Sequence, residues 1–327
     1  SLFFIIMMYT KYKPYTKEKH VQVFRRVIKN MDLMQLRAMA KINLGLDVVR
    51  KREDGYHEVR MIMQTIRMFD RVTVYRIPEP EIRISSNLHF LPVNENNIAY
   101  KAARMMLESQ PVRGGVSISL QKRIPVAAGM AGGSADAAAV LYAMNRIFYM
   151  GYTLEELMDF GLRLGADVPY CLMRGTALAE GIGEELTRLP ACPPCYVVIA
   201  KPAISVSTRF VYENLRLDET TRHPDIYGLA DAICRQDLYG MLPYMGNVLE
   251  SVTIPAYPII GEIKERFMEN GALISLMSGS GPTVFALFDN YEMALRAKEA
   301  LLEWGQVPLV YVTDLYRVRE ETPVNYW

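Results

Sequence analysis

Residues 125–139 read PVAAGMAGGSADAAA, a run of small residues where a loop meets a predicted helix. Glycine lets the backbone approach a neighbour closely because it has no Cβ. A helix N-terminus carries unpaired backbone N–H groups and a partial positive charge, so it can hold an anion. Two explanations remain open at this point: close packing of the helix against a sheet, or a phosphate group that approaches the backbone.

The glycine spacing differs from the two best-known nucleotide-binding loops. Gly129, Gly132 and Gly133 do not form G-x-G-x-x-G, and no lysine follows the last glycine as it does in a P-loop. Ser134 can cap the helix or place its hydroxyl near a metal ion that carries phosphate. A phosphate site in this stretch would therefore be of another kind.

The composition is that of a globular protein long enough for two domains. The chain has 327 residues, of which 50% are apolar and 22% are charged. Its formal net charge is +1, so no global field would attract nucleic acid, and we expect no nucleic-acid partner. Cys192 and Cys195 form a CPPC without the second pair of a zinc site, so we expect reduced thiols and no metal centre.

The first residues differ from the rest of the chain. The apolar run at residues 1–9 is too short to span a bilayer, and residues 11–29 are basic. No charged segment precedes the apolar run and no small-residue cleavage site follows it, so it does not have the pattern of a signal sequence. We expect residues 1–33 to be an N-terminal extension outside the fold, and a cytoplasmic protein without a membrane partner.

Hydrophobic periodicity predicts strands and helices in the first half of the chain. Alternating apolar residues predict strands at 40–49, 61–77, 82–87 and 116–124, with a turn at Asp54-Gly55. Helices are predicted at 94–109 with Asn94 or Asn96 near the cap, at 134–148, and at 153–165 with Thr153 and Glu156 as a capping box. Residues 166–184 are predicted to form a loop, a strand and a turn.

The proline-rich LPACPPCY at residues 189–196 marks a boundary between domains at 34–190 and 191–327. Beyond it, strands are predicted at 196–202, on both sides of a glycine turn within 273–288, and at 309–318. Helices are predicted at 207–215, 226–236, 258–270 and 291–304. This mixture of helices with an antiparallel sheet is an α+β arrangement.

Five stretches together resemble the GHMP kinases, a family of ATP-dependent small-molecule kinases. Pro125 and Gly129 match the P-x-x-x-G-L-x-S-S-A signature, with Met130 in place of the leucine. AKINLGLDV, DGYHEV, LGADVPYCL and SGSGPTVFALF resemble further motifs of one branch, in the same order. Ala131 and Ala135 depart from the glycine and the second serine that are usual there. The resemblance implies a ribosomal protein S5 domain 2-like N-terminal domain and a ferredoxin-like C-terminal domain.

The resemblance also implies roles for residues. Asp167 would accept the proton of an attacking alcohol, and Lys41 would pair with it and stabilise negative charge. The implied ATP-binding residues are Pro125, Val126, Ala127, Ala128, Gly129, Met130, Ala131, Gly132, Gly133, Ser134 and Ala135, together with Asn94, Asn96 and Lys122. The implied substrate-binding residues are Asn43, Tyr56, His57, Asp136, Thr208 and Tyr212, with Phe210 competing with Tyr212 as the side chain that stacks on a base.

The implied reaction is phosphorylation by ATP, with Mg²⁺ carried by the nucleotide, of a small alcohol that bears a cytidine diphosphate, in isoprenoid biosynthesis. We expect a monomer or a weak homodimer. One alternative is a family member that acts on mevalonate, phosphomevalonate or homoserine, but these substrates have no base for the DGYH turn. Others are a non-catalytic nucleotide-binding protein, which would have lost Lys41 or Asp167, and a redox protein, for which nothing near CPPC supplies thiolate activation.

Overall fold

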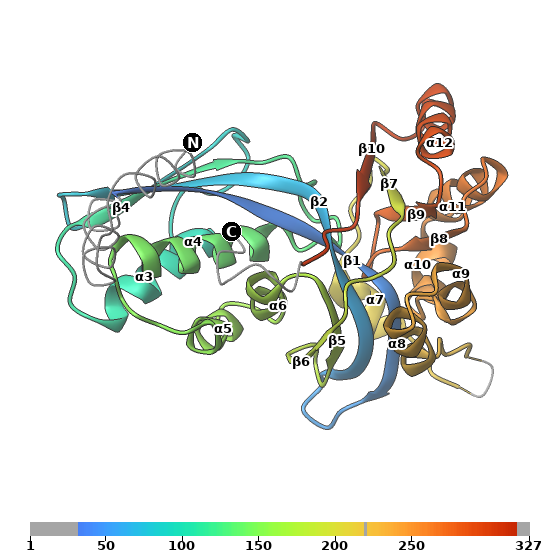
Figure 1. The fold of residues 1–327 in the computed structure, drawn as a ribbon, viewed down its shortest axis with the longest axis horizontal. Coiled ribbons are helices and arrows are strands. Elements are labelled where there is room, and N and C mark those ends of the chain that lie inside the picture. The colour runs from blue at the N-terminus through green and yellow to red at the C-terminus, as the bar shows by residue number, and fades with distance from the viewer. Residues whose placement is uncertain (1–31, 219–220, 319–327) are drawn as a thin grey trace, which may run out of the picture.

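The computed structural model describes residues 32–218 and 221–318. Within them, two sheets organise the chain, each with helices of its own, and the long strands β1 and β2 run from one end of the molecule to the region where the second sheet lies (Figure 1). The predicted α+β organisation is confirmed. Of the predicted extension at 1–33, residues 1–31 lie outside the described residues, and Leu33 already belongs to the first strand.

The first sheet has the order β3-β4-β2-β5-β6, with β1 along the other edge of β2. Its strands are β1 (Leu33–Lys51), β2 (His57–Ile77), β3 (Ile82–Ser86), β4 (Gly115–Gln121), β5 (Thr176–Glu180) and β6 (Glu185–Leu189). The turn between β1 and β2 forms as predicted: Gly55 has a φ of 86°, and the amide of Tyr56 donates to Asp54 Oδ1 at 3.0 Å.

Strand β1 is covered on both faces, although its alternation suggested one polar face. Ala40, Ile42 and Leu44 lie in a buried cluster with residues of the second sheet and its helices. Lys41 and Asn43 alternate with them and point to the other side of the strand, where they are nevertheless only 5% and 0% exposed. Register shifts between Met39 and Lys41 and between Asn43 and Gly45 mark bulges, which redirect side chains and occur often beside active sites.

Three helices pack on the first sheet, namely α3 (Ile98–Ser109), α4 (Gly132–Ile147) and α6 (Asp167–Met173), and α5 (Leu154–Leu162) packs on α4 and α6. Helix α4 lies beside α3 (Figure 1), and its alanines 135 and 137–139 are buried and let it approach β1 and β2 closely. The predicted capping box of α5 is present: Thr153 Oγ1 accepts from the amide of Glu156, and Glu156 caps the amide of Thr153 in return.

Two predictions about these helices are wrong. The N-cap of α3 is Asn97, whose Oδ1 accepts from the amide of Ala99 at 2.9 Å; Asn94 instead accepts from the amide of Asn96 in the preceding turn. Asp167 begins a helix, α6, where a loop was expected. Pro169 fits this helix, because a proline is tolerated in the first turn, where its missing N–H is not needed.

The second sheet has the order β10-β7-β9-β8 and is antiparallel throughout. Its strands are β7 (Tyr196–Lys201), β8 (Ile274–Met277), β9 (Val284–Phe288) and β10 (Leu309–Asp314). The helices of this half are α7 (Thr208–Asn214), α8 (Ile226–Cys234), α9 (Leu238–Met241), α10 (Glu250–Ala256), α11 (Ile259–Glu269) and α12 (Tyr291–Glu303), with a 3-10 turn at Leu242–Tyr244. The strand order, with helices between β7 and β8 and between β9 and β10, is ferredoxin-like.

The two sheets share apolar packing. Ile42 and Ile62 of the first sheet lie in one buried cluster with Val197 and Phe285 of the second. The segment at 246–248 pairs with β1: the amide of Leu46 donates to the carbonyl of Gly246 at 2.8 Å. The predicted boundary after residue 190 falls in the connection between β6 and β7, and it stays a prediction.

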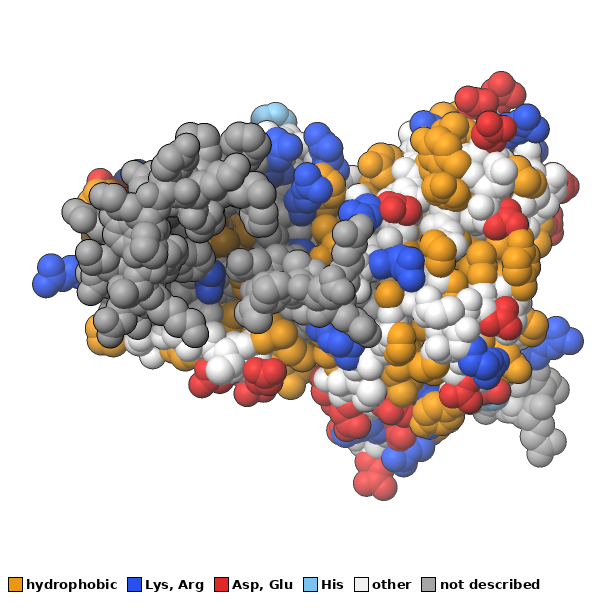
Figure 2. Space-filling view, in the orientation of Figure 1, with side chains coloured by type: hydrophobic (Ala, Val, Ile, Leu, Met, Phe, Trp, Pro, Cys, Tyr) orange, Lys and Arg blue, Asp and Glu red, His pale blue; other side chains and the backbone are white. Residues whose placement is uncertain are grey.

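Charged side chains of both signs lie on the part of the surface that the second sheet and its helices form. Over the elements of the second sheet, acidic and basic side chains are interspersed on the face that Figure 2 shows. Across residues 32–218 and 221–318, no helix has the length and apolar composition needed to cross a bilayer. The described cysteines are free thiols, and Cys192 and Cys195 are buried.

Candidate active site

A cleft of about 560 Å³ lies between the glycine-rich loop that precedes α4 and the turn at 278–281 that joins β8 to β9. This volume is in the range of small-molecule sites. The cleft brings together residues that are far apart in the sequence, among them Lys41, Gly133, Asp167, Tyr212 and Ser280.

The glycine-rich loop leaves the N-terminus of α4 open toward the cleft. Helix α4 begins at Gly132, and its N-cap Ala131 has φ 56° and ψ 29° with no side-chain cap. Ser134 therefore does not cap the helix; it lies in the first turn and lines the cleft. The first backbone N–H groups of a helix have no partner within it, so this end of α4 can hold an anionic ligand.

Close packing explains some of the small residues of this loop, and the phosphate explanation stays a prediction. A Cβ on Gly129 would lie 2.4 Å from the carbonyl oxygen of Ser278, and one on Gly132 would lie 3.0 Å from Ile124 Cγ2, so these glycines permit close packing. A Cβ on Gly133 would meet nothing closer than 3.5 Å, and Gly133 is exposed in the cleft. Gly133 is thus the glycine that leaves room for a ligand.

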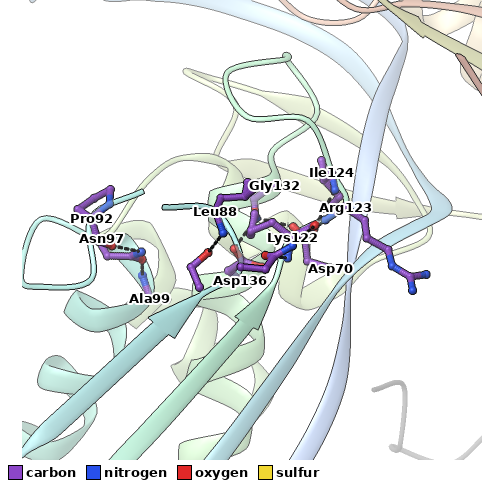
Figure 3. Close-up of polar contacts among 12 residues, drawn as sticks. Asp70, Leu88, Pro92, Asn97, Ala99, Lys122, Arg123, Ile124, Gly132 and Asp136 are labelled. Atoms are coloured by element: carbon purple, nitrogen blue, oxygen red, sulfur yellow. Dashed lines mark hydrogen bonds and ion pairs between the residues drawn. The ribbon is translucent and has the colours of Figure 1, made fainter. Parts of the chain in front are cut away.

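A buried cluster of charged side chains holds the end of the glycine-rich loop, where α4 begins. The Lys122 ammonium donates to Asp70 Oδ2, to Asp136 Oδ2 at 2.5 Å and to the carbonyl of Gly132 at 3.4 Å (Figure 3). Asp70 also accepts from the amides of Arg123 and Ile124, the latter at 2.8 Å. Since an ammonium has three donors, these contacts occupy all of them, and Lys122 anchors the start of α4 to β2.

One lysine between two carboxylates leaves a net negative charge in a buried place. Desolvation lowers the pKa of Lys122, but Asp136 and Asp70 outweigh it, so that the pKa is raised and the ammonium stays charged. Desolvation and the nearby Asp70 raise the pKa of Asp136 to about 7 in spite of Lys122. Oδ1 of Asp136 is buried without a hydrogen-bond partner among the described residues, which fits a carboxyl group that readily takes up a proton.

Lys41, Asn43 and Asp167 line the cleft together. Lys41 Nζ donates to Asn43 Oδ1 at 2.8 Å, and Asn43 Nδ2 lies 3.1 Å from Met61 Sδ. Across the described residues no ion pair joins Lys41 to Asp167, so the expected pairing is absent. Asp167 begins α6, where the helix dipole favours its negative charge.

Tyr212 and Thr208 reach the cleft from α7. The ring of Tyr212 lies 5.0 Å from the ring of His57, and desolvation together with Asp167 raises the pKa of its phenol to about 12. Phe210, the competing aromatic residue, is 38% exposed and does not line the cleft. Tyr212 is therefore the better placed of the two.

Some predicted residues do not line the cleft. Met130 and Ala135 are buried in the core, where a serine hydroxyl at position 135 would be enclosed. Asn94 lies in the exposed turn before α3, whereas Asn96 lines the cleft. Tyr56 is 61% exposed at the rim. His57 does not line the cleft itself, but its ring contacts that of Tyr212, which does. Burial and, to a smaller extent, the charge of Lys51 lower the pKa of His57.

The cleft also contains residues that were not predicted as site residues, among them Asn97, Ile182, Gly279 and Ser280. Ser280 Oγ lies 2.8 Å from Thr208 Oγ1, which joins two walls of the cleft. Gly279 and Ser280 belong to the Ser-Gly-Ser-Gly motif at 278–281, which the sequence shows. The position of this motif beside Gly129 depends on how the two sheets pack.

Comparisons with known proteins agree with one another. Family models of the GHMP kinases N terminal domain and the GHMP kinases C terminal match residues 97–175 and 229–307. A 4-diphosphocytidyl-2-C-methyl-D-erythritol kinase of Lachnoclostridium phytofermentans is 59% identical over 267 residues, covering 82% of this chain and 92% of that protein. A crystal structure of 4-(cytidine 5'-diphospho)-2C-methyl-D-erythritol kinase has a TM-score of 0.74 and 36% identity, covering 86% and 99%. A homoserine kinase from Cytophaga hutchinsonii shares the fold, with a TM-score of 0.71, 21% identity and coverage of 88% and 96%.

Proposed function

Since this chain belongs to the GHMP kinase family, we propose that it transfers the γ-phosphoryl group of ATP to the 2-hydroxyl of 4-diphosphocytidyl-2-C-methyl-D-erythritol. The predicted family, two-domain fold and kinase activity are confirmed by the relatives and the family models. One observation of the structure supports the reaction most directly: the uncapped N-terminus of α4 opens into the same cleft as Lys41, Asn43 and Asp167.

We assign Asp167 as the group that takes the proton of the attacking hydroxyl. In this transfer the alcohol oxygen forms a bond to the γ-phosphorus, the bond to the β–γ bridging oxygen breaks, and ADP leaves. Lys41, held by Asn43 at 2.8 Å, supplies positive charge near the oxygen that becomes negative. Alignment and charge stabilisation supply most of the rate increase in such reactions.

The nucleotide is proposed to lie along the glycine-rich loop, with its phosphates at the first turn of α4. Asn96 is placed to contact the base or ribose, while Lys122 acts by anchoring the loop, because its donors are already occupied. Mg²⁺ is a hard cation that prefers oxygen ligands. Ser134 lines the cleft and has no hydrogen-bond partner within residues 32–218 and 221–318, so its hydroxyl fits a Mg²⁺ carried by ATP, which neutralises phosphate charge when bound.

The cytidine end is proposed to lie against His57 and Tyr212. Their rings are 5.0 Å apart, and a pyrimidine can stack on Tyr212 while a neutral imidazole offers one donor and one acceptor to its edge. A monomer or a weak homodimer is part of the proposal, and ATP as phosphoryl donor supports a place in the cytoplasm.

The proposal is tested by ADP release with magnesium-ATP and three alcohols: 4-diphosphocytidyl-2-C-methyl-D-erythritol, mevalonate and homoserine. We expect turnover with the first alone and a loss of at least about 100-fold in Asp167→Asn. Asp159→Asn, an exposed aspartate on α5, is the control and should keep full activity. Turnover with mevalonate or homoserine instead would refute the substrate, and an active Asp167→Asn would refute the base.

A further inference from the structure

The turn at 278–281 is the wall of the cleft that faces the glycine-rich loop. Gly279 and Ser280 line the cleft, and Ser278 Oγ donates to the carbonyl of Gly129 at 3.1 Å. The backbones of the two segments are in contact, since a Cβ on Gly129 would collide with the carbonyl oxygen of Ser278. The position of the turn therefore sets the position of Gly129, three residues before α4.

Asn247 holds this turn in place from outside the cleft, which it does not line. Asn247 is 7% exposed, and its Nδ2 donates both hydrogens, to the carbonyls of Met277 and Gly279, each at 2.8 Å. Its Oδ1 accepts from the amide of Leu249 at 3.0 Å. Glu250 holds the same turn, because its Oε1 accepts from the amide of Met277 at 2.7 Å.

The segment that carries Asn247 is itself fixed to the strand with the proposed catalytic lysine. Leu46 of β1 donates to the carbonyl of Gly246 at 2.8 Å and accepts from the amide of Val248 at 3.0 Å. Five residues earlier on β1 lies Lys41. One asparagine thus lies at the meeting point of β1, the 278–281 turn and, through that turn, the glycine-rich loop.

We infer that Asn247 is a positioning residue for phosphoryl transfer: its carboxamide fixes the 277–279 backbone, and through Ser278 and Gly129 it aligns the phosphate-binding end of α4 with Lys41 on β1. This inference rests on the proposed kinase function. Asn247 touches neither substrate; it acts through the backbone of the turn. A displacement of about 1 Å in such an arrangement can lower a rate by about 100-fold.

Asn247→Asp tests the inference, because it keeps the shape of the side chain and removes both donated hydrogens. We expect kcat to fall by about 10- to 100-fold while the KM for ATP changes by less than about threefold, since alignment rather than binding is lost. Asn145→Asp is the matched control. Asn145 is also a buried asparagine, and it holds both the carbonyl and the amide of Tyr152, at 2.8 and 3.0 Å, away from the cleft.

Both variants should lose stability, but only Asn247→Asp should lose kcat. A folded Asn247→Asp with kcat within about twofold of the wild type would overturn the inference, as would an equal loss in Asn145→Asp. If Asn247→Asp does not fold, Ser278→Ala carries the test by removing the contact with Gly129, and an unchanged kcat would overturn it. A wild type without turnover refutes the proposed function instead, so the two failures are distinguishable.

Discussion

Ala131 places a side chain where the backbone favours glycine. Its φ of 56° lies in the left-handed region, which costs a residue with a Cβ about 1–2 kcal/mol. The requirement comes from the geometry of the loop, because the chain must turn there to begin α4 with its N–H groups toward the cleft. The departure from the family pattern at this position is thus an energetic cost within the glycine-rich loop.

Ala131→Gly should increase the free energy of unfolding by about 0.5–1 kcal/mol, because the strain removed exceeds the entropy that glycine adds to the unfolded chain. Urea denaturation measures the change. Ala138→Gly within α4 is the control and should lower the same quantity by about 1 kcal/mol or more, since glycine weakens a helix interior. Destabilisation by both substitutions would contradict the strain assigned to Ala131.

Asp136 should make the stability of the protein depend on pH. Its pKa is raised to about 7 in the folded protein, so the folded state holds the proton more tightly than the unfolded chain does. Between about pH 5 and 7 the wild type should therefore lose stability relative to Asp136→Asn as pH rises, by up to about 1.4 kcal/mol per pH unit, and the difference should level off above about pH 7. Urea denaturation of both proteins across this range checks it, and a difference that does not vary with pH would exclude this role.

Among single residues, sequence reasoning found most side chains of the cleft but not their contacts. Lys41 and Asp167 were expected to pair, yet Lys41 contacts Asn43, because the bulges in β1 set the direction of these side chains. Lys122 was expected to bind ATP, and the sequence did not predict its contact with Asp70. The two residues are 52 positions apart and meet only through the pairing of β2 with β4. Periodicity describes which face a side chain is on, and pairing of distant strands decides what it meets.

At the scale of the element, the start of α4 depends on the cluster of Lys122, Asp70 and Asp136 more than on a cap of its own. The long, regular elements were predictable because their apolar residues repeat with a clear period, as in β1, β2 and α12. Among the helices of seven residues or fewer, α7 was predicted, whereas α6, α9 and α10 were not, because tertiary packing rather than local pattern largely stabilises such short helices.

Lys122→Met should lower the free energy of unfolding by about 3–5 kcal/mol, because it leaves two buried carboxylates without a counter-charge. Adding Asp136→Asn should restore part of that loss, since one of those charges is then gone. Arg50→Met is the control: its pair with Glu58 at 2.5 Å is exposed, and its loss should cost no more than about 1 kcal/mol. Equal losses from Lys122→Met and Arg50→Met in urea denaturation would show that the cluster does not anchor the helix.

At the scale of the whole molecule, the two sheets are bound into one packed unit. The cluster that contains Ile42 and Phe285 crosses from one sheet to the other, and the amide of Tyr316, after β10, donates to the carbonyl of Thr65 on β2 at 2.8 Å. The presence of two sheets could be predicted from the order of strands and helices. Their contact could not, because it depends on which faces of β1 and β7 meet.

This shared packing predicts a single cooperative unfolding transition. In a Trp327→Phe variant, Trp304 at the end of α12 is the remaining tryptophan and reports on the second sheet, while far-ultraviolet circular dichroism reports on both. The two signals should change at the same urea concentration. Val197→Ala in the shared cluster should move both midpoints together, and separate midpoints in either protein would show that the halves unfold independently.

The continuous packing between the sheets also bears on how reactants enter and products leave. A kinase built from two separate bodies can open and close by a hinge, but bending here would expose the apolar cluster around Ile42 to water. Reactants and products must then pass the rim of the cleft, where Asn96, Val126 and Ala127 are exposed and line the cleft without entering the core. We therefore expect solvent viscosity to slow the release of ADP through this opening, while the chemical step keeps its rate.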